Sequence, residues 1–264
     1  MNKFIIRFYN YFLHFYLSRQ KMKEIDLSLL DLIKNAKTDD LKNEKYLEEN
    51  LLPKLGLNNE RPKMFPKELI GFGLFHCQYP IQFGKYLALL SKLKIDSYME
   101  IGVRHGGTFV ITNEYLKRFG NLQLSLAVDI GYSPSLVKYC EANTNAKFVQ
   151  INSQSKKFRQ YLQNYDSIDL VLVDADHTEL GCRYDYESVK ELANIVVLHD
   201  ISNDNCLGVK NVWESIKQES NKYICYEFIG QYQHILKKEN KEYLGIGVAV
   251  KRDYIKKMNI LIRD

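Results

Sequence analysis

Four side chains in two short motifs have the residue types and spacing that could do chemistry together. Asp174 and His177 lie at the end of one apolar run of the chain, and His199 and Asp200 follow the next one. Grouped carboxylates and imidazoles can bind a divalent cation. A histidine whose pKa lies near neutrality can also accept a proton from a hydroxyl group. The motifs therefore predict a site for cation-assisted or base-assisted chemistry, provided that the fold brings them together.

The two apolar runs indicate how the fold would do so. Residues 168–174, IDLVLVD, and residues 194–198, NIVVL, are typical of strands that are buried on both faces. In an open α/β sheet, the ligand crevice lies at the carboxyl ends of the parallel strands. We therefore expect both motifs at one edge of the sheet. Acidic and imidazole groups that converge there would be costly without a ligand.

A glycine-rich motif precedes both, at residues 97–110, SYMEIGVRHGGTFV. It predicts a short buried strand, a tight loop and a helix, which is the opening of a nucleotide-binding α/β unit. Its pattern is Glu-Ile-Gly-x-x-x-Gly-Gly-Thr, and not the dinucleotide-binding pattern Gly-x-Gly-x-x-Gly. The carboxylate of Glu100 at the strand end would repel a pyrophosphate and suits a ligand with a cationic or amine-bearing end.

This motif resembles the first motif of the class I S-adenosylmethionine (SAM) methyltransferases. The resemblance implies that the acidic residue and the loop hold the amino-acid half of SAM. The residues of this sequence at those positions are Glu100, Gly102, Gly106, Gly107 and Thr108. Arg104 and His105, in the same loop, are further candidates for a contact with the carboxylate of SAM or with the acceptor.

The next strands supply the other candidate cofactor residues. Asp129 ends the strand expected at 124–129, where a carboxylate accepts hydrogen bonds from ribose hydroxyls in nucleotide-binding units. Asn152 and Ser153 follow the strand expected at 147–151, at a position that usually approaches the adenine in this fold. Asp174 completes the expected cofactor-binding set.

Asp-Ala-Asp-His from Asp174 and His-Asp from His199 resemble the metal-assisted O-methyltransferases, over roughly residues 70–250. That group includes the cephalosporin-hydroxylase-like proteins and the macrolide-sugar and capsule-sugar O-methyltransferases. The resemblance implies that Asp174 and Asp200 bind a divalent cation. His199, where the family often has Glu, would be the third ligand, which favours Mn²⁺ or another imidazole-tolerant ion over Mg²⁺. It also places His177 at the position of the catalytic base, beside Asp174, with His199 as a rival base.

The function that this resemblance implies is SAM-dependent O-methylation of a hydroxyl group on a sugar, expected to be nucleotide-linked, in capsule or surface polysaccharide biosynthesis. The further candidates for the acceptor pocket are Glu179, Arg183 and Tyr184. A small catechol-like or antibiotic acceptor is an alternative. From other classes, a NAD-binding oxidoreductase is disfavoured by Glu100 and the missing Gly-x-Gly-x-x-Gly. A non-catalytic SAM-fold partner subunit is disfavoured by the intact set of acids and histidines.

The expected architecture is an α/β, Rossmann-like methyltransferase sheet of seven strands with helices on both faces. The last two strands, expected at 223–229 and 245–250, would form its antiparallel end. Residues 1–68 are expected to form an N-terminal helical extension that caps the acceptor site or mediates dimerisation. Residues 69–264 would form the SAM-binding domain.

The composition indicates which binding partners and which cellular compartment to expect. The 264 residues are 45% hydrophobic and 26% charged, as in a soluble globular protein. The formal charge of +5 comes from dispersed Lys and Arg without a long basic run, so no nucleic-acid partner is expected. The five cysteines show no Cys-x-x-Cys spacing, and we expect them to be reduced in a cytoplasmic protein. A small-molecule acceptor and a homo-oligomer are the expected partners.

The first 17 residues, MNKFIIRFYNYFLHFYL, are apolar and aromatic but interrupted by Arg7, Asn10 and His14. They lack the uninterrupted apolar centre and the cleavage site of a signal peptide, and they are shorter than the ~20 residues that span a bilayer. We expect a helix packed on its own domain or on a second copy. The alternative is a helix that rests on a membrane surface.

Overall fold

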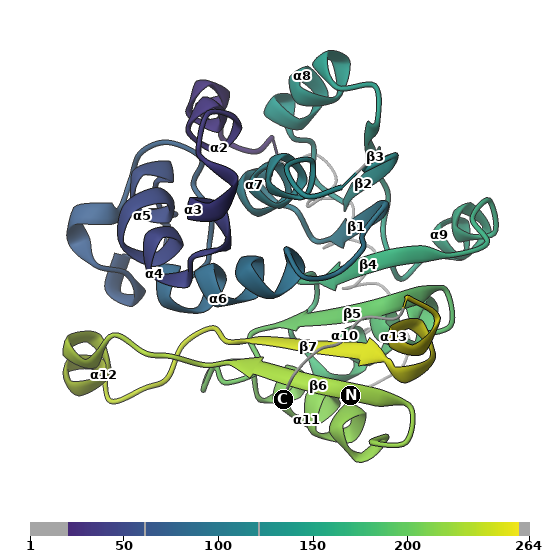
Figure 1. Cartoon of the computed structure of the whole chain (residues 1–264). Coiled ribbons are helices and arrows are strands. Elements are labelled where there is room, and N and C mark those ends of the chain that lie inside the picture. The colour runs from purple at the N-terminus through teal and green to yellow at the C-terminus, as the bar shows by residue number, and fades with distance from the viewer. Residues whose placement is uncertain (1–20, 61, 121, 259–264) are drawn as a thin grey trace.

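A seven-stranded sheet forms the centre of the computed structural model, which describes residues 21–60, 62–120 and 122–258 (Figure 1). The strand order is β3-β2-β1-β4-β5-β7-β6. Strands β1 to β5 pair in parallel, and β7 runs antiparallel to both β5 and β6. Their bounds are β1 Ser97–Ile101, β2 Leu124–Asp129, β3 Ala146–Gln150, β4 Ile168–Val173, β5 Ala193–His199, β6 Tyr223–Phe228 and β7 Ile246–Lys251. The predicted Rossmann-like sheet with an antiparallel end is confirmed.

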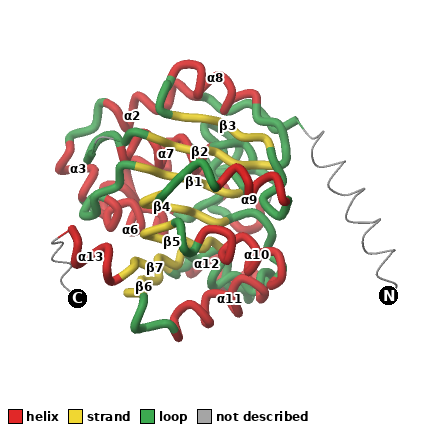
Figure 2. The backbone as a smooth tube through the Cα atoms, turned by 90° about the vertical axis from the view of Figure 1, so that its right-hand side faces the viewer, coloured by secondary structure: helices red, strands yellow, loops and turns green. Residues whose placement is uncertain are grey.

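Helices cover both faces of the sheet (Figure 2). One face packs against α6 Pro80–Leu90, α7 Gly107–Leu116, α8 Pro134–Ala142 and α13 Arg252–Met258. The other face packs against α9 Lys156–Leu162, α10 Glu179–Val189 and α11 Leu207–Gln218. The remaining helix of this part of the chain, α12 Gln233–Glu239, lies between β6 and β7 in the sequence.

Consecutive side chains of the central strands point to opposite faces and so build two apolar layers. Tyr98 belongs to the layer shared with α6 and α7, whereas Met99 belongs to the layer shared with α10 and α11. The same alternation separates Leu172 from Val171 in β4. Because both faces are covered, these strands are runs of apolar residues and not alternating apolar and polar ones.

The described part of the N-terminal segment is a series of short helices that pack against α6 and α7. Its buried Ile33, Leu41, Leu47 and Leu55 belong to the same apolar layer as those two helices. The helices are η1 Leu27–Leu30, α2 Asp31–Lys34, α3 Thr38–Lys42, α4 Glu44–Tyr46, the π-helix η2 Leu47–Leu51, α5 Leu52–Leu55, η3 Pro62–Met64 and η4 Lys67–Leu69. The predicted domain boundary after residue 68 stays a prediction.

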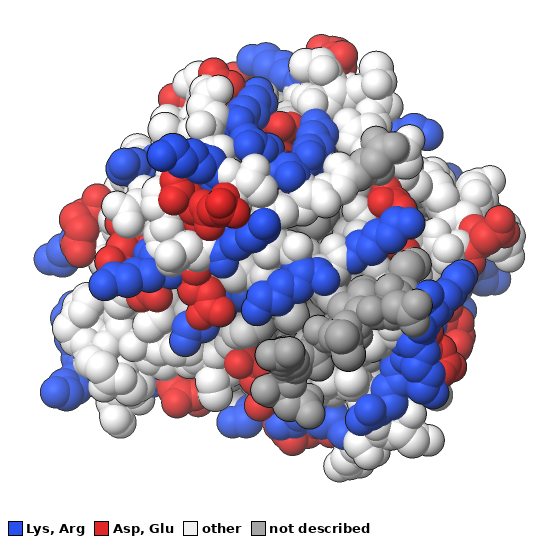
Figure 3. All heavy atoms as spheres, viewed as in Figure 1, with Lys and Arg blue, Asp and Glu red and all other residues white. Residues whose placement is uncertain are grey.

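Charges of both signs are mixed on the surface in view in Figure 3, where Lys and Arg are interspersed with Asp and Glu. Within residues 21–60, 62–120 and 122–258, none of the helices has the length and apolar character needed to cross a bilayer. The aromatic segment at residues 1–17, and with it the predicted packing or membrane contact, lies outside the described residues.

Gly107, the first residue of α7, lies so close to the N-terminal segment that a side chain cannot fit. A Cβ atom there would lie 2.1 Å from the carbonyl oxygen of Leu74 and 2.9 Å from the amide nitrogen of His76. We expect Gly107→Ala to lower the free energy of unfolding by about 1–3 kcal/mol, measured by urea denaturation, because two backbone segments must separate. Gly120→Ala, whose Cβ would have its nearest contact at 3.6 Å, is the control and should change it by less than about 0.5 kcal/mol. Equal stability of the two variants would contradict this close packing.

Candidate functional site

A cavity of about 720 Å³ lies at the carboxyl ends of the parallel strands. It is lined by Glu100 of β1, Asp129 of β2, Asp174 after β4, and His199 at the end of β5. Its volume falls in the range of about 300–1,000 Å³ that is usual for small-molecule sites. The cavity lies at the sheet edge where the sequence predicts a ligand crevice.

The glycine after β1 brings two of these strands together at their ends. Gly102 has a left-handed backbone with φ +93°, and a Cβ atom there would lie 2.3 Å from the carbonyl oxygen of Asp174. The amide of Asp174 donates a hydrogen bond to the carbonyl oxygen of Ile101 at 2.8 Å. The close approach therefore needs a glycine, and it places Glu100 and Asp174 on the same edge of the sheet.

Glu100 is a buried carboxyl group in the cavity wall, with 1% of its surface exposed. Its Oε2 accepts a hydrogen bond from the hydroxyl of Tyr98, two residues earlier on the same face of β1. Burial raises the pKa of Glu100 to about 8, and the nearby negative charge of Asp174 adds to this effect although the Tyr98 hydrogen bond opposes it. A cationic ligand group would offset the cost of ionising this carboxyl.

Asp129 holds the glycine loop while it lines the cavity. Its Oδ2 accepts a hydrogen bond from the amide of Arg104 at 2.7 Å, and its Oδ1 accepts one from the amide of Gly131 at 2.7 Å. Each carboxylate oxygen can accept a second hydrogen bond, so the group can also serve a ligand hydroxyl. Burial raises the pKa of Asp129, against the lowering effect of the backbone hydrogen bonds.

The loop after β3 adds a residue that the sequence analysis missed. Asn152 and Ser153 line the cavity as predicted, and so does the next residue, Gln154. The amide of Gln154 donates to Oδ1 of Asn152 at 2.8 Å, and its Nε2 donates to Oδ2 of Asp176 at 2.9 Å. Gln154 therefore ties the loop after β3 to the loop after β4. Because Gln154 directly follows Ser153 in the sequence, it could have been predicted to line the cavity as well.

The acids and histidines after β4 and β5 form one cluster. Asp174 Oδ1 lies 3.2 Å from Nε2 of His177 and 3.0 Å from Nδ1 of His199. Asp200 Oδ2 lies 3.2 Å from the same nitrogen of His177 and 3.8 Å from Nδ1 of His199. The structure thus brings together all four residues that the two sequence motifs contributed.

The pKa values of the cluster residues are strongly shifted. Burial alone would raise the pKa of Asp174, yet His199 and His177 hold it well below its usual range. Burial opposes a charge on both imidazoles. Asp174 and Asp200 outweigh it, raising the pKa of His199 to about 9 and that of His177 above its ordinary value. His177 has the more accessible side chain, 34% exposed against 3% for His199.

Asp174, His199 and Asp200 also have the composition of a metal site. One ligand atom from each lies within 4.8 Å of the others. Nε2 of His199 is buried and has no hydrogen-bond partner. Two carboxylates and an imidazole fit a divalent cation, and the nitrogen ligand suits Mn²⁺ or Zn²⁺ better than Mg²⁺. The residues present therefore fit the predicted cation.

The N-terminal segment builds the opposite wall of the cavity, which the sequence analysis did not assign to individual residues. The cavity residues that precede β1 are Met22, Asn58, Phe75 and Cys77. The amide of Lys23 donates to Nδ1 of His105 at 3.2 Å. Nε2 of His105 therefore carries the proton and donates to Glu60 Oε1 at 3.1 Å. Glu60 also forms an ion pair with Arg104, so it fixes both side chains of the glycine loop.

Some predicted residues lie elsewhere. Gly106 does not line the cavity but precedes α7 with φ +97°, packed against the side chain of Leu136. The three predicted acceptor-pocket residues are also outside the cavity lining, which corrects that expectation. Glu179 forms an ion pair with Arg183, and Tyr184 stacks under Arg159 at 4.3 Å. They lie on α10, whose first turn contributes Leu180 and Gly181 to the cavity instead.

Comparisons with known proteins find likeness in fold only. No protein-family model matches the chain, and a search of curated proteins finds no match. Among solved structures, the O-methyltransferase TomG from Streptomyces achromogenes, solved with SAM, is 14% identical, with a TM-score of 0.46 over 87% of this chain and 91% of that one. MycE methyltransferase from the mycinamycin pathway, solved with Mg and SAH, is 12% identical, with a TM-score of 0.46 over 67% of this chain and 49% of that one. Fibrillarin of Aeropyrum pernix, solved with SAM, is 11% identical, with a TM-score of 0.43 over 63% of this chain and 74% of that one. Likeness of this size carries no function over, and the functional conclusion rests on the geometry of this chain.

Proposed function

We propose that this protein is a SAM-dependent O-methyltransferase that uses His177 as the base and a divalent cation to bind its acceptor. The observation that supports this most is that one cavity joins the buried acid of the glycine loop, Glu100, with the Asp/His cluster after β4 and β5. A cationic donor and a hydroxyl acceptor can then lie side by side in that cavity, as methyl transfer requires.

The donor would be held by the residues that line the first half of the cavity. Glu100 and the glycine loop would bind its amino-acid end, Asp129 its ribose hydroxyls, and Asn152 and Ser153 its adenine side. Bound there, SAM supplies a methyl carbon that is activated by an adjacent sulfonium. The apolar side chains of Ile130 and Ile151, which also line the cavity, suit the faces of an aromatic base.

The acceptor hydroxyl would be bound and deprotonated by the Asp/His cluster. Nε2 of His177 carries a proton that it donates to the carboxylates, so its other ring nitrogen, Nδ1, takes the proton of the hydroxyl, and Asp174 and Asp200 stabilise the charged imidazole that results. Asp174, His199 and Asp200 would hold the cation, which when bound lowers the pKa of a coordinated hydroxyl and fixes its position. Because a free hydroxyl is protonated at neutral pH, the histidine base and the cation would both promote the loss of its proton.

The acceptor that we propose first is a sugar hydroxyl, on a nucleotide-linked sugar of surface polysaccharide biosynthesis, since neighbouring sugar hydroxyls can bind the cation together. A small aromatic acceptor is the second candidate. It is favoured by Phe75, Leu180 and Leu244, which line the cavity with apolar surface.

Two experiments test this proposal. Calorimetry with SAM and with NAD⁺ should detect binding of SAM, whereas binding of NAD⁺ alone would exclude a methyltransferase. The protein should then transfer the label of radiolabelled SAM to one of two acceptor classes, nucleotide sugars or catechols. Label on catechols but not on sugars would replace the first acceptor with the second.

Glu100 predicts how SAM affinity depends on pH. Below the pKa of about 8 the free protein keeps a proton on Glu100, and a cationic ligand favours the ionised carboxylate, so binding releases that proton. The dissociation constant for SAM should therefore fall as the pH rises from about 6 to about 7.5, by up to about tenfold per unit. Glu100→Gln should weaken binding and remove this slope.

The measurement is calorimetry in two buffers of different ionisation enthalpy, which counts the protons released. Glu114→Gln is the matched control, because Glu114 is also buried but does not line the cavity. Binding of SAM without proton release near pH 6.5 would contradict the assigned contact.

A further inference from the structure

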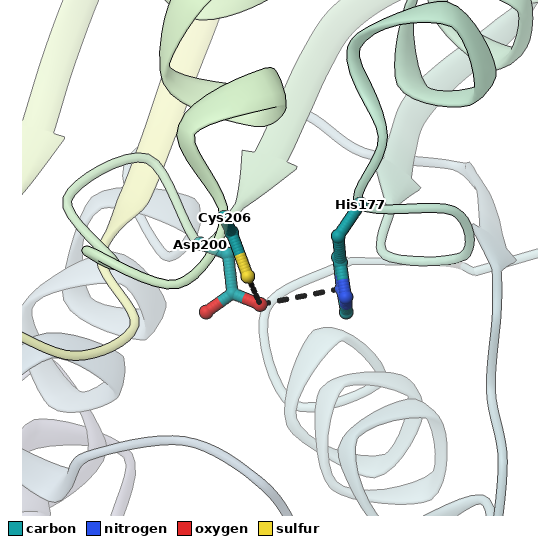
Figure 4. Close-up of side chains that lie close together, drawn as sticks. All are labelled: His177, Asp200 and Cys206. Carbon is teal, nitrogen blue, oxygen red and sulfur yellow. Dashed lines mark hydrogen bonds and ion pairs between the residues drawn. The ribbon is translucent and has the colours of Figure 1, made fainter.

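Cys206 lies against the Asp/His cluster, in a position that the proposed reaction does not use. Its Sγ lies 3.5 Å from Oδ2 of Asp200, the same oxygen that lies 3.2 Å from Nε2 of His177 (Figure 4). The three side chains come from two loops, since Asp200 and Cys206 share the loop between β5 and α11 and His177 lies in the loop before α10, and they converge on one point. One ligand atom from each lies within 4.8 Å of the other two.

We propose that His177, Asp200 and Cys206 form a binding site for a thiophilic divalent ion of the Zn²⁺ class, and that an ion bound there inhibits the enzyme. The site differs from the set Asp174, His199 and Asp200 in carrying a sulfur ligand. The two sets share only Asp200.

The two separations that involve Asp200 match those of a tetrahedral zinc site. With Zn–N and Zn–O bonds of about 2.0 Å and a Zn–S bond of about 2.3 Å, tetrahedral angles put ligand N and O about 3.3 Å apart and ligand S and O about 3.5 Å apart. The observed separations are 3.2 Å between His177 Nε2 and Asp200 Oδ2, and 3.5 Å between Cys206 Sγ and the same oxygen. Three protein ligands leave the fourth position open for water, as in other zinc sites that are not purely structural.

The surroundings suit a sulfur ligand once an ion is present and allow an ion to enter. Burial and the Asp200 carboxylate oppose a free thiolate, but a bound ion displaces the thiol proton, and Cys206 precedes α11, a helix of 12 residues whose positive end stabilises the negative charge on sulfur. Cys206 is only 5% exposed and Asp200 only 2%, so the ligands are shielded from bulk water. Asp200 and His177 line the cavity, which gives an ion its path.

Inhibition follows from the identity of the nitrogen ligand. A neutral imidazole has only one basic lone pair, so when an ion is bound to Nε2 of His177, Nδ1 keeps its proton and the ring cannot accept a proton from the acceptor hydroxyl. This consequence rests on the proposed function, whereas the metal site itself does not. A metal-binding experiment without SAM or acceptor therefore tests the site separately.

Co²⁺ is the probe for that experiment, because a Co²⁺–thiolate bond gives a charge-transfer band in the near ultraviolet. The full chain titrated with Co²⁺ should show the band, and so should Cys182→Ser, whose cysteine is equally buried but lies in α10. Cys206→Ser should lack it. Its affinity for Zn²⁺, measured by competition with a coloured chelator, should fall by at least about 10–100-fold, the usual cost of losing even an outer partner of a metal ligand.

X-ray absorption of the Zn²⁺-loaded wild-type protein keeps the proposal testable if Cys206→Ser fails to fold. One sulfur at about 2.3 Å is expected among nitrogen and oxygen ligands. A shell of nitrogen and oxygen alone, or a Co²⁺ band that persists in Cys206→Ser, would overturn the site. If the site binds Zn²⁺ but added Zn²⁺ leaves methyl transfer unchanged in wild type, the assignment of His177 as base is wrong and the metal site stands.

Discussion

We expect His177→Gln to lower kcat by about 10²–10⁴-fold, the usual contribution of a general base, while SAM binds with unchanged affinity. Glutamine can still donate a hydrogen bond to Asp174 or Asp200, so the cluster stays paired, but it cannot accept a proton. Because Asp174 and Asp200 raise the pKa of His177 against the effect of burial, wild-type activity should rise with pH through a value above 6.5. This rise of activity with pH should be absent in His177→Gln.

Steady-state rates across pH, with SAM binding measured by calorimetry, check this result. His234→Gln is the control, because His234 is exposed on α12, outside the cavity lining. Activity of His177→Gln within a few-fold of wild type would exclude His177 as the base and leave His199 as the rival.

Asp174→Asn should have an effect of comparable size, because Asp174 contacts both histidines and is a ligand of the proposed cation. Loss of several kcal/mol of transition-state stabilisation by the cation corresponds to about 10²–10⁴-fold in rate. Treatment of the wild-type protein with EDTA should lower its activity to a similar level, and Mn²⁺ should restore it better than Mg²⁺. Activity that is indifferent to chelation would exclude the cation.

Asp169→Asn separates this effect from a loss of stability. Asp169 lies near the start of β4, whereas Asp174 follows the end of this strand. Oδ2 of Asp169 accepts hydrogen bonds from the amides of Asp96 and Ser97 at 2.9 and 3.1 Å. This variant should be destabilised but should keep the catalytic rate of its folded fraction. Equal loss of rate in both variants would show that Asp174→Asn acts through folding.

The sheet could be predicted from the sequence because strands that are buried on both faces are runs of apolar residues, which are easy to recognise. The ranges 168–174 and 194–198 contain the apolar runs 170–173 and 195–198. The observed strand Ile168–Val173 differs from the first range by one residue at one end, and Ala193–His199 differs from the second by one residue at each end. The residues of the cluster were found for the same reason. They directly follow strands, and parallel pairing of β4 with β5 brings the strand ends side by side.

The opposite wall could not be predicted, because it depends on contacts between distant parts of the chain. Glu60 lies 44 residues before Arg104, and nothing in its local pattern distinguishes it from other surface acids. The place of Cys206 beside the cluster could not be predicted for a similar reason. Asp200 has a left-handed backbone with φ +64°, and the turn that begins there brings Cys206 back to Asp200. A sequence pattern does not record such a turn.

The contact of Glu60 with the glycine loop has a consequence for how the proposed methyltransferase could diversify. The half of the cavity that faces the proposed cofactor is built from strand ends, where each residue is constrained by the pairing of the sheet. The half that contains Met22, Asn58 and Phe75 is built from loops beside short helices, and the main constraint on those helices is to cover α6 and α7. Substitutions in residues 21–77 could therefore change which acceptor enters the proposed site, while the strand-end groups proposed to perform the transfer keep their positions.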